Sequence, residues 1–355
     1  MSQQQIRVGI IGAGSISDLH IAGHQRSSRS NVMAICDQNA ERAKAKARQY
    51  GIPHYCTNYK ELLSLKDIDA IVICTYNATH AQIAIDALAS QKHVFVEKPL
   101  CISYEEAQEI EAAVKKSGKQ LQVGFVRRFD SKVEKIKEMV DSGAIGEIYY
   151  AKMSALRRLG NPGGWFADKE KSGGGPLIDV GIHLLDLCLY FMASPTVKTV
   201  KAVTYKKLGS RNHIKNLSYY TAADPGEGNN TVEELAAASI RFDNGACLLL
   251  DTSYTLHASK DETVCIIYGT KGGVEVEPNF VVSTDCYNTI LNAYPQIDQD
   301  VSHLQSAYPK QIEGFIDCCM NGSAPRHSIE DSLLTMKIIH AIYESAENGN
   351  EIFFE

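Results

Sequence analysis

Short apolar runs alternate with amphipathic stretches through the first 125 residues, and this rhythm limits the fold more than any other feature of the chain. The apolar runs predict buried strands at Ile6–Ile11, Asn31–Cys36, Ala70–Thr75, His93–Val96 and Leu121–Phe125. Helical patterns lie between them, at Ala40–Tyr50, from Asn58, at Asn77–Ser90 and from Ser103 to Lys116. Strands that alternate with helices form a parallel sheet, because right-handed crossovers place the helices on its faces. The sequence therefore predicts an α/β domain with a doubly wound parallel sheet over residues 1–125.

A glycine turn joins the first predicted strand to the first helix, and an acidic residue follows the second strand. Gly12 permits a tight turn, and Gly14 lets the backbone approach a pyrophosphate at the helix N-terminus. The third small residue of the motif is Ser17 rather than glycine. Asp37, 23 residues after Gly14, can accept hydrogen bonds from both ribose hydroxyls and would repel a 2′-phosphate. This order is typical of a Rossmann dinucleotide site and favours NAD over NADP, with Arg42 as the one feature that suits NADP.

Polar residues also follow the later strands of this domain. Ligands of an open parallel sheet bind beyond the carboxyl ends of its strands. Ser17, Asp37, Thr75–Asn77 and Glu97–Pro99 all fall at such ends. A lysine after a strand is ordinarily only exposed, but Lys98 follows a strand whose end faces the predicted cofactor cleft. We therefore expect Lys98 to contact the substrate.

After residue 125 the rhythm changes, and strand patterns dominate. Alternating runs from Thr196 to about Thr289 are typical of an antiparallel sheet with one covered face. The other expected elements are a helix at Ser131–Ser142, a strand at Glu147–Ala155, hairpin turns at Asp243–Gly245 and Lys271–Gly273, and helices at His303–Asn321 and Ser328–Glu347. Two long loops are expected, at Leu159–Gly175 and Gly209–Asn230. These patterns predict a second, α+β domain over residues 126–355, whose C-terminal helices we expect to pack back on the first domain.

The stretch Gly173–Tyr190 combines a glycine run, a proline suited to a first helical turn, and a polar stripe between aliphatic residues. On one helix from Pro176 to about Met192, this stripe is formed by Asp179, His183, Asp186 and Tyr190. Buried carboxylate and imidazole groups need partners, and their pKa values are easily moved. The stripe is therefore either a structural Asp–His contact in the core or a general acid/base.

Composition and charge exclude several classes of function. The net charge is −6, from 36 basic and 42 acidic residues, and no long basic run is present, which argues against a nucleic acid or a membrane surface as partner. The ten cysteines are scattered without a CxxC motif, so we expect reduced thiols rather than a disulfide framework. We find neither a leader pattern at the start nor an uncharged apolar run of ~18 residues, and we expect a cytoplasmic protein. Beyond Asp179 and His183 we see no cluster of metal ligands, so no metal is expected.

Five motifs, spread over nearly the whole chain, are more specific together than any one of them alone. They are Gly12-Ala-Gly14, Cys74-Thr75-Tyr76-Asn77-Ala-Thr-His80, Glu97-Lys98-Pro99, Val123-Gly-Phe-Val-Arg-Arg-Phe129 and Gly175-Pro-Leu-Ile-Asp179-Val-Gly-Ile-His183-Leu-Leu-Asp186. With similar patterns at Gln311–Asp317 and Ser328–Asp331, the chain resembles the Gfo/Idh/MocA family, the relatives of glucose–fructose oxidoreductase and inositol dehydrogenase. The resemblance implies a Rossmann domain followed by an α+β domain with a large, open, mostly antiparallel sheet. That sheet commonly forms the oligomer interface, so a homodimer or homotetramer is expected.

The resemblance also implies that Lys98, Asp179 and His183 gather over the nicotinamide of NAD and act on a secondary alcohol of a sugar, polyol or related small molecule. We expect His183 to take the hydroxyl proton, Lys98 to stabilise the oxygen and Asp179 to orient the imidazole. The residues expected to bind the cofactor are Gly12, Gly14, Ser15, Ile16, Asp37, Thr75, Tyr76, Asn77, His80, Glu97 and Lys98. The candidate substrate-wall residues are Arg127, Arg157, Asn161, Trp165, Tyr254 and His257. The family often has proline in place of Tyr76, so the wall near the nicotinamide is expected to differ in shape.

Three other functions fit parts of this pattern. A non-catalytic NAD-binding sensor or regulator would keep the nucleotide site alone. An NAD-dependent glycosidase would use transient oxidation to assist elimination at a glycosidic bond. A metal enzyme would use the i,i+4 spacing of Asp179 and His183. The presence of Lys98 together with Asp179 and His183 argues against the non-catalytic sensor, and the lack of a further His/Cys cluster argues against the metal enzyme.

Overall fold

The computed structural model describes residues 5–209, 211, 213–214, 222, 224, 230–297 and 304–354. The chain forms two compact units, one made of residues 1–129 and 304–333 and the other of residues 130–303 and 334–355. The sequence places a domain boundary at 125/126, whereas the units divide after Phe129. The first unit also includes the C-terminal stretch 304–333.

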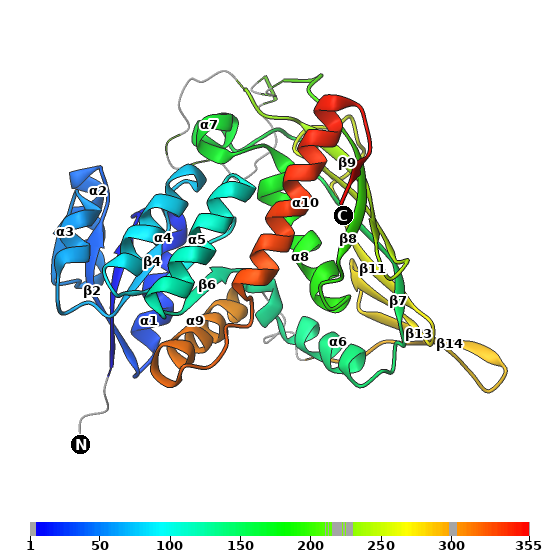
Figure 1. The fold of residues 1–355 in the computed structure, drawn as a ribbon, viewed down its shortest axis with the longest axis horizontal. Helices are drawn as coiled ribbons and strands as arrows, with labels where there is room; N and C mark the ends of the chain where they lie inside the picture. The colour runs from blue at the N-terminus through cyan, green and yellow to red at the C-terminus, as the bar shows by residue number, and fades with distance from the viewer. Residues whose placement is uncertain are drawn as a thin grey trace. The chain divides into compact units, whose positions relative to one another are not determined.

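A six-stranded parallel sheet forms the centre of the first unit, which confirms the predicted doubly wound domain (Figure 1). Its strands are β1 (Ile6–Ile11), β2 (Ser30–Cys36), β3 (His54–Cys56), β4 (Ala70–Ile73), β5 (His93–Glu97) and β6 (Leu121–Gly124). They follow the order β3-β2-β1-β4-β5-β6, so the direction of strand addition reverses between β1 and β4. Such a reversal is where open α/β sheets bind their ligands. The three-residue edge strand β3 was not predicted, because it is short and largely exposed.

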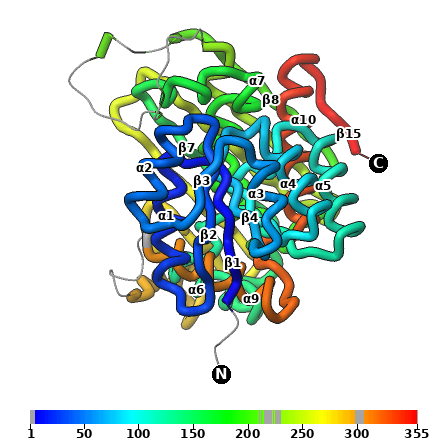
Figure 2. Tube along the Cα trace, turned by 90° about the vertical axis from the view of Figure 1, so that its left-hand side faces the viewer, coloured from blue at the N-terminus to red at the C-terminus, as the bar shows by residue number. Residues whose placement is uncertain are grey.

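Helices cover both faces of this sheet (Figure 2). On one face lie α1 (Ser15–Arg26), α2 (Ala40–Tyr50) and α9 (Leu304–Asn321), and on the other lie α3 (Tyr59–Ser64), α4 (His80–Ala89) and α5 (Tyr104–Ser117). Two of the predicted caps are present: Asn58 accepts a hydrogen bond from the N–H of Lys60 at 3.0 Å, and Ser103 accepts one from the N–H of Glu106 at 3.2 Å. Each cap satisfies an orphan N–H and fixes where its helix begins.

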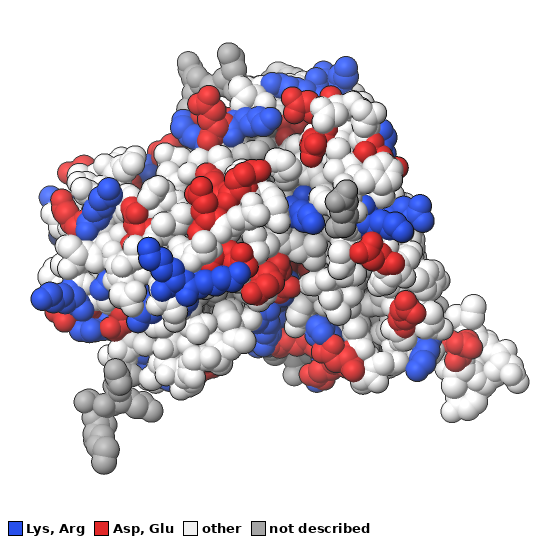
Figure 3. All heavy atoms as spheres, viewed as in Figure 1, with Lys and Arg blue, Asp and Glu red and all other residues white. Residues whose placement is uncertain are grey.

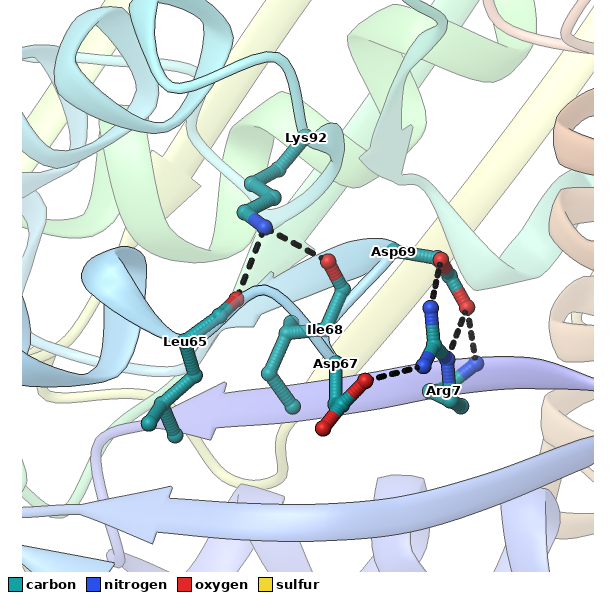
Figure 4. A network of polar contacts seen from close by, with 6 residues as sticks. All are labelled: Arg7, Leu65, Asp67, Ile68, Asp69 and Lys92. Atoms are coloured by element: carbon teal, nitrogen blue, oxygen red, sulfur yellow. Dashed lines mark hydrogen bonds and ion pairs between the residues drawn. The ribbon is translucent and has the colours of Figure 1, made fainter.

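A polar network holds the amino ends of the strands, at the edge opposite to the predicted cofactor site (Figure 4). Arg7 on β1 donates to both carboxylate oxygens of Asp69 at 2.9 Å. Lys92 precedes β5 and donates to the carbonyl oxygens of Leu65 at 2.9 Å and Ile68 at 2.7 Å. Burial alone would raise the pKa of Asp69, but the hydrogen bonds and charge of Arg7 outweigh burial and lower it. The network therefore fastens the turn before β4 to its two neighbouring strands.

A nine-stranded, mostly antiparallel sheet forms the second unit, as predicted (Figure 1). Its strands are β7 (Ile148–Leu156), β8 (Val197–Tyr205), β9 (Leu235–Phe242), β10 (Cys247–Ser253), β11 (Glu262–Gly269), β12 (Gly273–Glu277), β13 (Val281–Cys286), β14 (Thr289–Ala293) and β15 (Ile352–Phe353). The order is β14-β13-β12-β11-β7-β10-β9-β8-β15, and within the described residues β7 and β10 form the parallel pair. The predicted hairpins join β9 to β10 and β11 to β12.

The two faces of this sheet have different surroundings. Helices α6 (Ser131–Asp141) and α8 (Ile182–Phe191) lie on one face, where Ala151, Met153 and Leu248 are buried. Val203, Leu249 and Tyr268 lie on the other face and are 38–43% exposed. Among the described residues of this unit, the sheet is therefore covered on one side and open on the other.

Three features of the second unit differ from the predictions. The predicted continuous helix begins with a π-helical turn, η4 (Leu177–Gly181), before α8. The predicted irregular loop 159–175 contains two short helices, η3 (Gly164–Ala167) and α7 (Lys169–Ser172). β15 follows the last helix, α10 (Ile329–Asn348), and was not predicted because pairing with β8, not a local pattern, defines it. Most of the predicted loop Gly209–Asn230 lies outside the described residues.

All ten cysteines are free thiols, and none of them is exposed. The first unit holds six, Cys36, Cys56, Cys74, Cys101, Cys318 and Cys319, and the second holds Cys188, Cys247, Cys265 and Cys286. Burial raises the thiol pKa of Cys36, Cys74 and Cys101. One stretch, Lys169–Phe191, is long and apolar enough to cross a membrane, but 78% of its most apolar window is buried within the protein.

Candidate active site

The glycine turn after β1 has the shape that a dinucleotide site requires. Gly12 adopts a φ of +98°, and a Cβ at this position would lie 2.5 Å from the carbonyl oxygen of Cys74, so only glycine fits. At Gly14 a Cβ would meet nothing within 4 Å, so the N-terminus of α1 begins at an open backbone position. Ser17, the departure from the glycine motif, is fully buried, and its hydroxyl donates to the carbonyl oxygen of Gly14 at 2.6 Å.

The carboxylate of Asp37 is fixed beside this turn at the end of β2. One oxygen accepts a hydrogen bond from the N–H of Ala13 at 2.9 Å, and the other accepts one from the N–H of Asn39 at 2.8 Å. A guanidinium nitrogen of Arg42 lies 3.8 Å from the same carboxylate. Each carboxylate oxygen can accept two hydrogen bonds, so capacity remains for ribose hydroxyls. The side chains and the turn thus fit the adenosine part of NAD.

The ends of β4 and β5 carry the remaining residues predicted for the cofactor. Thr75 accepts a hydrogen bond from the hydroxyl of Thr79 at 2.7 Å, Tyr76 is half-buried, and Asn77 opens the short helix η1 (Asn77–Thr79) and is buried. Lys98 is half-buried directly after β5. All four residues therefore follow the carboxyl ends of neighbouring parallel strands.

A buried carboxylate–imidazole pair lies beneath this edge. The side chain of Glu97, the last residue of β5, lies 2.6 Å from Nε2 of His20 on α1. His20 is fully buried, and its ring meets the ring of Phe95 edge-on at 4.9 Å. The pair fastens the helix of the glycine turn to the strand that leads into Lys98. The predicted contact of Glu97 with the cofactor stays a prediction.

In the second unit, Asp179 belongs to the π-helical turn and His183 to the first turn of α8. Both side chains are half-buried. Tyr254 donates its hydroxyl to a carboxylate oxygen of Asp179 at 2.7 Å, and the tyrosine is 3% exposed. Asp186, the third member of the predicted stripe, is fully buried, so the stripe continues into the core rather than along an accessible face. π-helical turns are rare and are frequent at functional sites.

Glu233 anchors the segment that carries Asp179. Its carboxylate accepts hydrogen bonds from the N–H groups of Gly175 at 2.8 Å and Leu177 at 3.3 Å. Tyr343 on α10 donates its hydroxyl to the same carboxylate at 2.9 Å. Burial raises the pKa of Glu233, and these hydrogen bonds oppose the rise. The carboxylate satisfies N–H groups at the beginning of the π-helical turn, which no earlier residue of the helix can do.

The six predicted substrate-wall residues have different surroundings. Arg127, in the first unit, is half-buried; Arg157 and His257, in the second, are exposed. Asn161 is half-buried, and its side chain accepts a hydrogen bond from the N–H of Gly163 at 2.8 Å. Trp165 stacks on Phe166 with ring centroids 3.8 Å apart. The hydroxyl of Tyr254 is used by Asp179, so this tyrosine supports a predicted catalytic residue.

Sequence reasoning named Tyr254 only as a substrate-wall residue, and it missed Glu233 and His20. Tyr254 lies 75 residues from Asp179 and His20 lies 77 from Glu97, so no local spacing relates the members of either pair. His20 does fall one turn beyond Ser17 on the inner side of α1, where a buried polar residue was a usable signal. Within the part of the chain that the structure describes, no group of three or more His, Cys, Asp or Glu side chains could hold a metal ion.

On the face seen in Figure 3, acidic and basic side chains are interspersed rather than gathered into one basic patch. A nucleic-acid site requires a basic patch or stripe, which this face does not show.

Comparison with known proteins places these features in a family. Residues 6–125 match the family described as "Oxidoreductase family, NAD-binding Rossmann fold", and residues 133–275 match the GFO/IDH/MocA C-terminal domain. The chain is 31% identical to D-glucoside 3-dehydrogenase of Escherichia coli (strain K12), over 99% of this chain and 98% of that protein. It is 29% identical to scyllo-inositol 2-dehydrogenase (NAD(+)) of Bacillus subtilis (strain 168), over 98% of this chain and 96% of that protein.

The fold agrees with these matches. A solved structure of levoglucosan dehydrogenase, in complex with NADH and levoglucosan, superposes with a TM-score of 0.85 at 23% identity, covering 99% of each chain. At that identity the likeness concerns the fold, and the sequence matches carry the family. The chain belongs to the Gfo/Idh/MocA family of oxidoreductases, with an NAD-binding Rossmann domain and the family's C-terminal sheet domain.

Proposed function

We propose that this oxidoreductase oxidises a secondary hydroxyl group on a six-membered ring, in a glucoside, a free sugar or a cyclic polyol. The names of two full-length relatives support this substrate class, because one acts on a D-glucoside and the other on scyllo-inositol. Both compounds present several equatorial secondary hydroxyls on a rigid ring. NAD, when bound, supplies the hydride acceptor.

The residues of the glycine turn suit that cofactor. Gly12 allows the turn, the open position at Gly14 allows the pyrophosphate to approach the N-terminus of α1, and Asp37 retains acceptor capacity for the ribose. We propose that Ser15, Ile16, Thr75, Tyr76 and Asn77 complete the cofactor site.

We propose that Lys98, Asp179 and His183 act on the same hydroxyl group. His183 in its neutral form accepts the hydroxyl proton, because one nitrogen of a neutral imidazole has a lone pair that can take up a proton. Lys98 donates a hydrogen bond to the oxygen and stabilises the negative charge that develops there. Asp179 supports the imidazolium that forms, and Tyr254 holds Asp179 in place. The observation that carries this assignment is the buried Tyr254–Asp179 hydrogen bond one helical turn before His183.

A substrate screen with active-site variants tests the proposal. The screen measures NADH formation from inositols, hexoses and methyl glucosides, with NAD and NADP in parallel. Lys98→Met and His183→Asn should each lower kcat at least about 100-fold, the lower range for acid–base assistance, with the affinity for NADH retained. The controls Lys116→Met and His340→Asn change exposed residues of the same types. Turnover of Lys98→Met and His183→Asn near the wild-type rate would refute the assignment.

We further propose a homo-oligomer that forms through the open face of the nine-stranded sheet. The exposed Val203, Leu249 and Tyr268, on strands β8, β10 and β11, support this interface, because monomeric proteins rarely expose large contiguous apolar patches. We propose the cytoplasm as the compartment. The ten free thiols support it, because disulfides form in oxidising compartments and are rare in cytosolic proteins.

A further inference from the structure

His80 is a buried imidazole that none of the proposed steps uses, and it lies beside two strand ends of the proposed site. It begins α4 and is 1% exposed. Its Nδ1 lies 2.8 Å from the carbonyl oxygen of Pro99, and its Nε2 lies 3.1 Å from the carbonyl oxygen of Thr75. Thr75 follows β4, and Pro99 follows Lys98 after β5. One ring therefore bridges the turns that leave two neighbouring parallel strands.

The chemistry of the ring makes the two contacts unequal. A neutral imidazole carries one N–H, so only one of the two carbonyl oxygens can receive a donated hydrogen bond. Burial lowers the pKa of His80, and the charge of Lys98 lowers it further. The two carbonyl groups and Glu97 oppose this shift but do not cancel it. The ring is therefore neutral near pH 7. The shorter contact is at Nδ1. The geometry therefore favours the tautomer in which Nδ1–H donates to Pro99.

We propose that His80 is a positioning residue for Lys98: its Nδ1–H holds the carbonyl of Pro99 and thereby fixes the backbone from which the lysine side chain leaves. The inference rests on the proposed role of Lys98. It also revises the expectation that His80 binds the cofactor, since both ring nitrogens point at backbone carbonyls. A displacement of ~1 Å at a catalytic group can cost about 100-fold in rate. Loss of the hydrogen bond between His80 and Pro99, the residue after Lys98, should therefore lower kcat measurably.

Three variants separate the two contacts. In His80→Asn the side-chain amide nitrogen can take the place of Nδ1, in His80→Gln it can take the place of Nε2, and His80→Leu offers neither. The measurements are kcat and KM for scyllo-inositol and methyl β-D-glucoside, NADH affinity by fluorescence titration, and the thermal midpoint. We expect His80→Asn to keep a kcat at least about tenfold above that of His80→Gln, with the NADH affinity of both within roughly threefold of wild type.

Equal kcat values for His80→Asn and His80→Gln would overturn the proposal, as would a loss confined to NADH affinity. Because His80→Leu can fail to fold, the comparison of the two amide variants decides. A second measurement uses the protein without NAD: nuclear magnetic resonance of ¹⁵N-labelled histidine, with the His80 signal identified by its absence in His80→Asn. A neutral ring with the proton on Nδ1 is expected, and a proton on Nε2 would overturn the proposal.

The result for Lys98→Met keeps the two proposals distinguishable. Turnover by Lys98→Met at the wild-type rate would remove the proposed function of Lys98 whatever His80 does. An inactive Lys98→Met combined with equal rates for His80→Asn and His80→Gln would remove only the role of His80.

Discussion

Three carboxylates of the candidate site are each held by a partner from a distant part of the chain. Asp37 is held by the glycine turn, Glu97 by His20 and Asp179 by Tyr254. A carboxylate with a fixed partner loses little conformational freedom when a ligand binds, so its hydrogen bonds contribute more to binding. At the scale of single residues, the fold supplies preorganised acceptors rather than flexible ones.

Acid should destabilise the first unit, and His24 should account for part of the effect. Burial, with a smaller contribution from His20, lowers the pKa of His24 to about 3, whereas an unfolded histidine titrates near ~6.5. Between these values the unfolded chain binds a proton that the folded chain does not. The free energy of unfolding therefore falls by roughly 1.4 kcal/mol for each pH unit below ~6.5, and this loss ends near the folded pKa.

Urea unfolding at pH values from 7 to 4.5 measures this dependence. His24→Gln removes the titrating group, so its unfolding free energy should fall less steeply with decreasing pH than that of the wild type. His54→Gln changes an exposed histidine of the same unit and should keep the wild-type slope. Identical slopes for the wild type and His24→Gln would contradict the assignment.

At the scale of elements, local signals predicted most of the fold and the strand ends of the site. The caps Asn58 and Ser103 and the alternating apolar runs are properties of neighbouring residues, so they can be recognised without the structure. The π-helical turn at Leu177–Gly181 could not be predicted, because its backbone is held by Glu233, more than 50 residues away. β15 likewise exists through its pairing with β8. Long-range hydrogen bonds thus account for what the sequence did not predict.

Replacing Glu233 should loosen the segment that carries Asp179. In Glu233→Gln one of the two acceptor oxygens becomes an amide nitrogen, which then faces a hydrogen-bond donor. An unsatisfied buried group of this kind costs about 1–3 kcal/mol, so the urea midpoint and kcat should both fall. Tyr343→Phe removes only one of the three hydrogen bonds and should cost less. A Glu233→Gln variant as stable as Tyr343→Phe would show that the backbone N–H groups do not depend on this carboxylate.

At the scale of the whole molecule, the open sheet face predicts the state of assembly. Light scattering on a sizing column should give a mass of at least two 39.0-kDa chains. Leu249→Lys places a charge within that face and should shift the protein toward the monomer, since burying an unpaired charge is costly. Leu65→Lys is the matched control, because Leu65 is 37% exposed and Leu249 38%, and Leu65 lies in the other unit. A wild-type mass of one chain would contradict the proposed interface.

The ten free cysteines, six of them buried and four half-buried, give the protein an internal reporter of unfolding. Buried thiols with raised pKa react slowly with maleimides, so the rate of alkylation measures how often each thiol becomes exposed. Six of the thiols belong to one unit and four to the other, and peptide mass spectrometry distinguishes the two sets. Brief labelling pulses along a denaturant series would therefore reveal which of the two units unfolds first, with the native cysteines as the only probes.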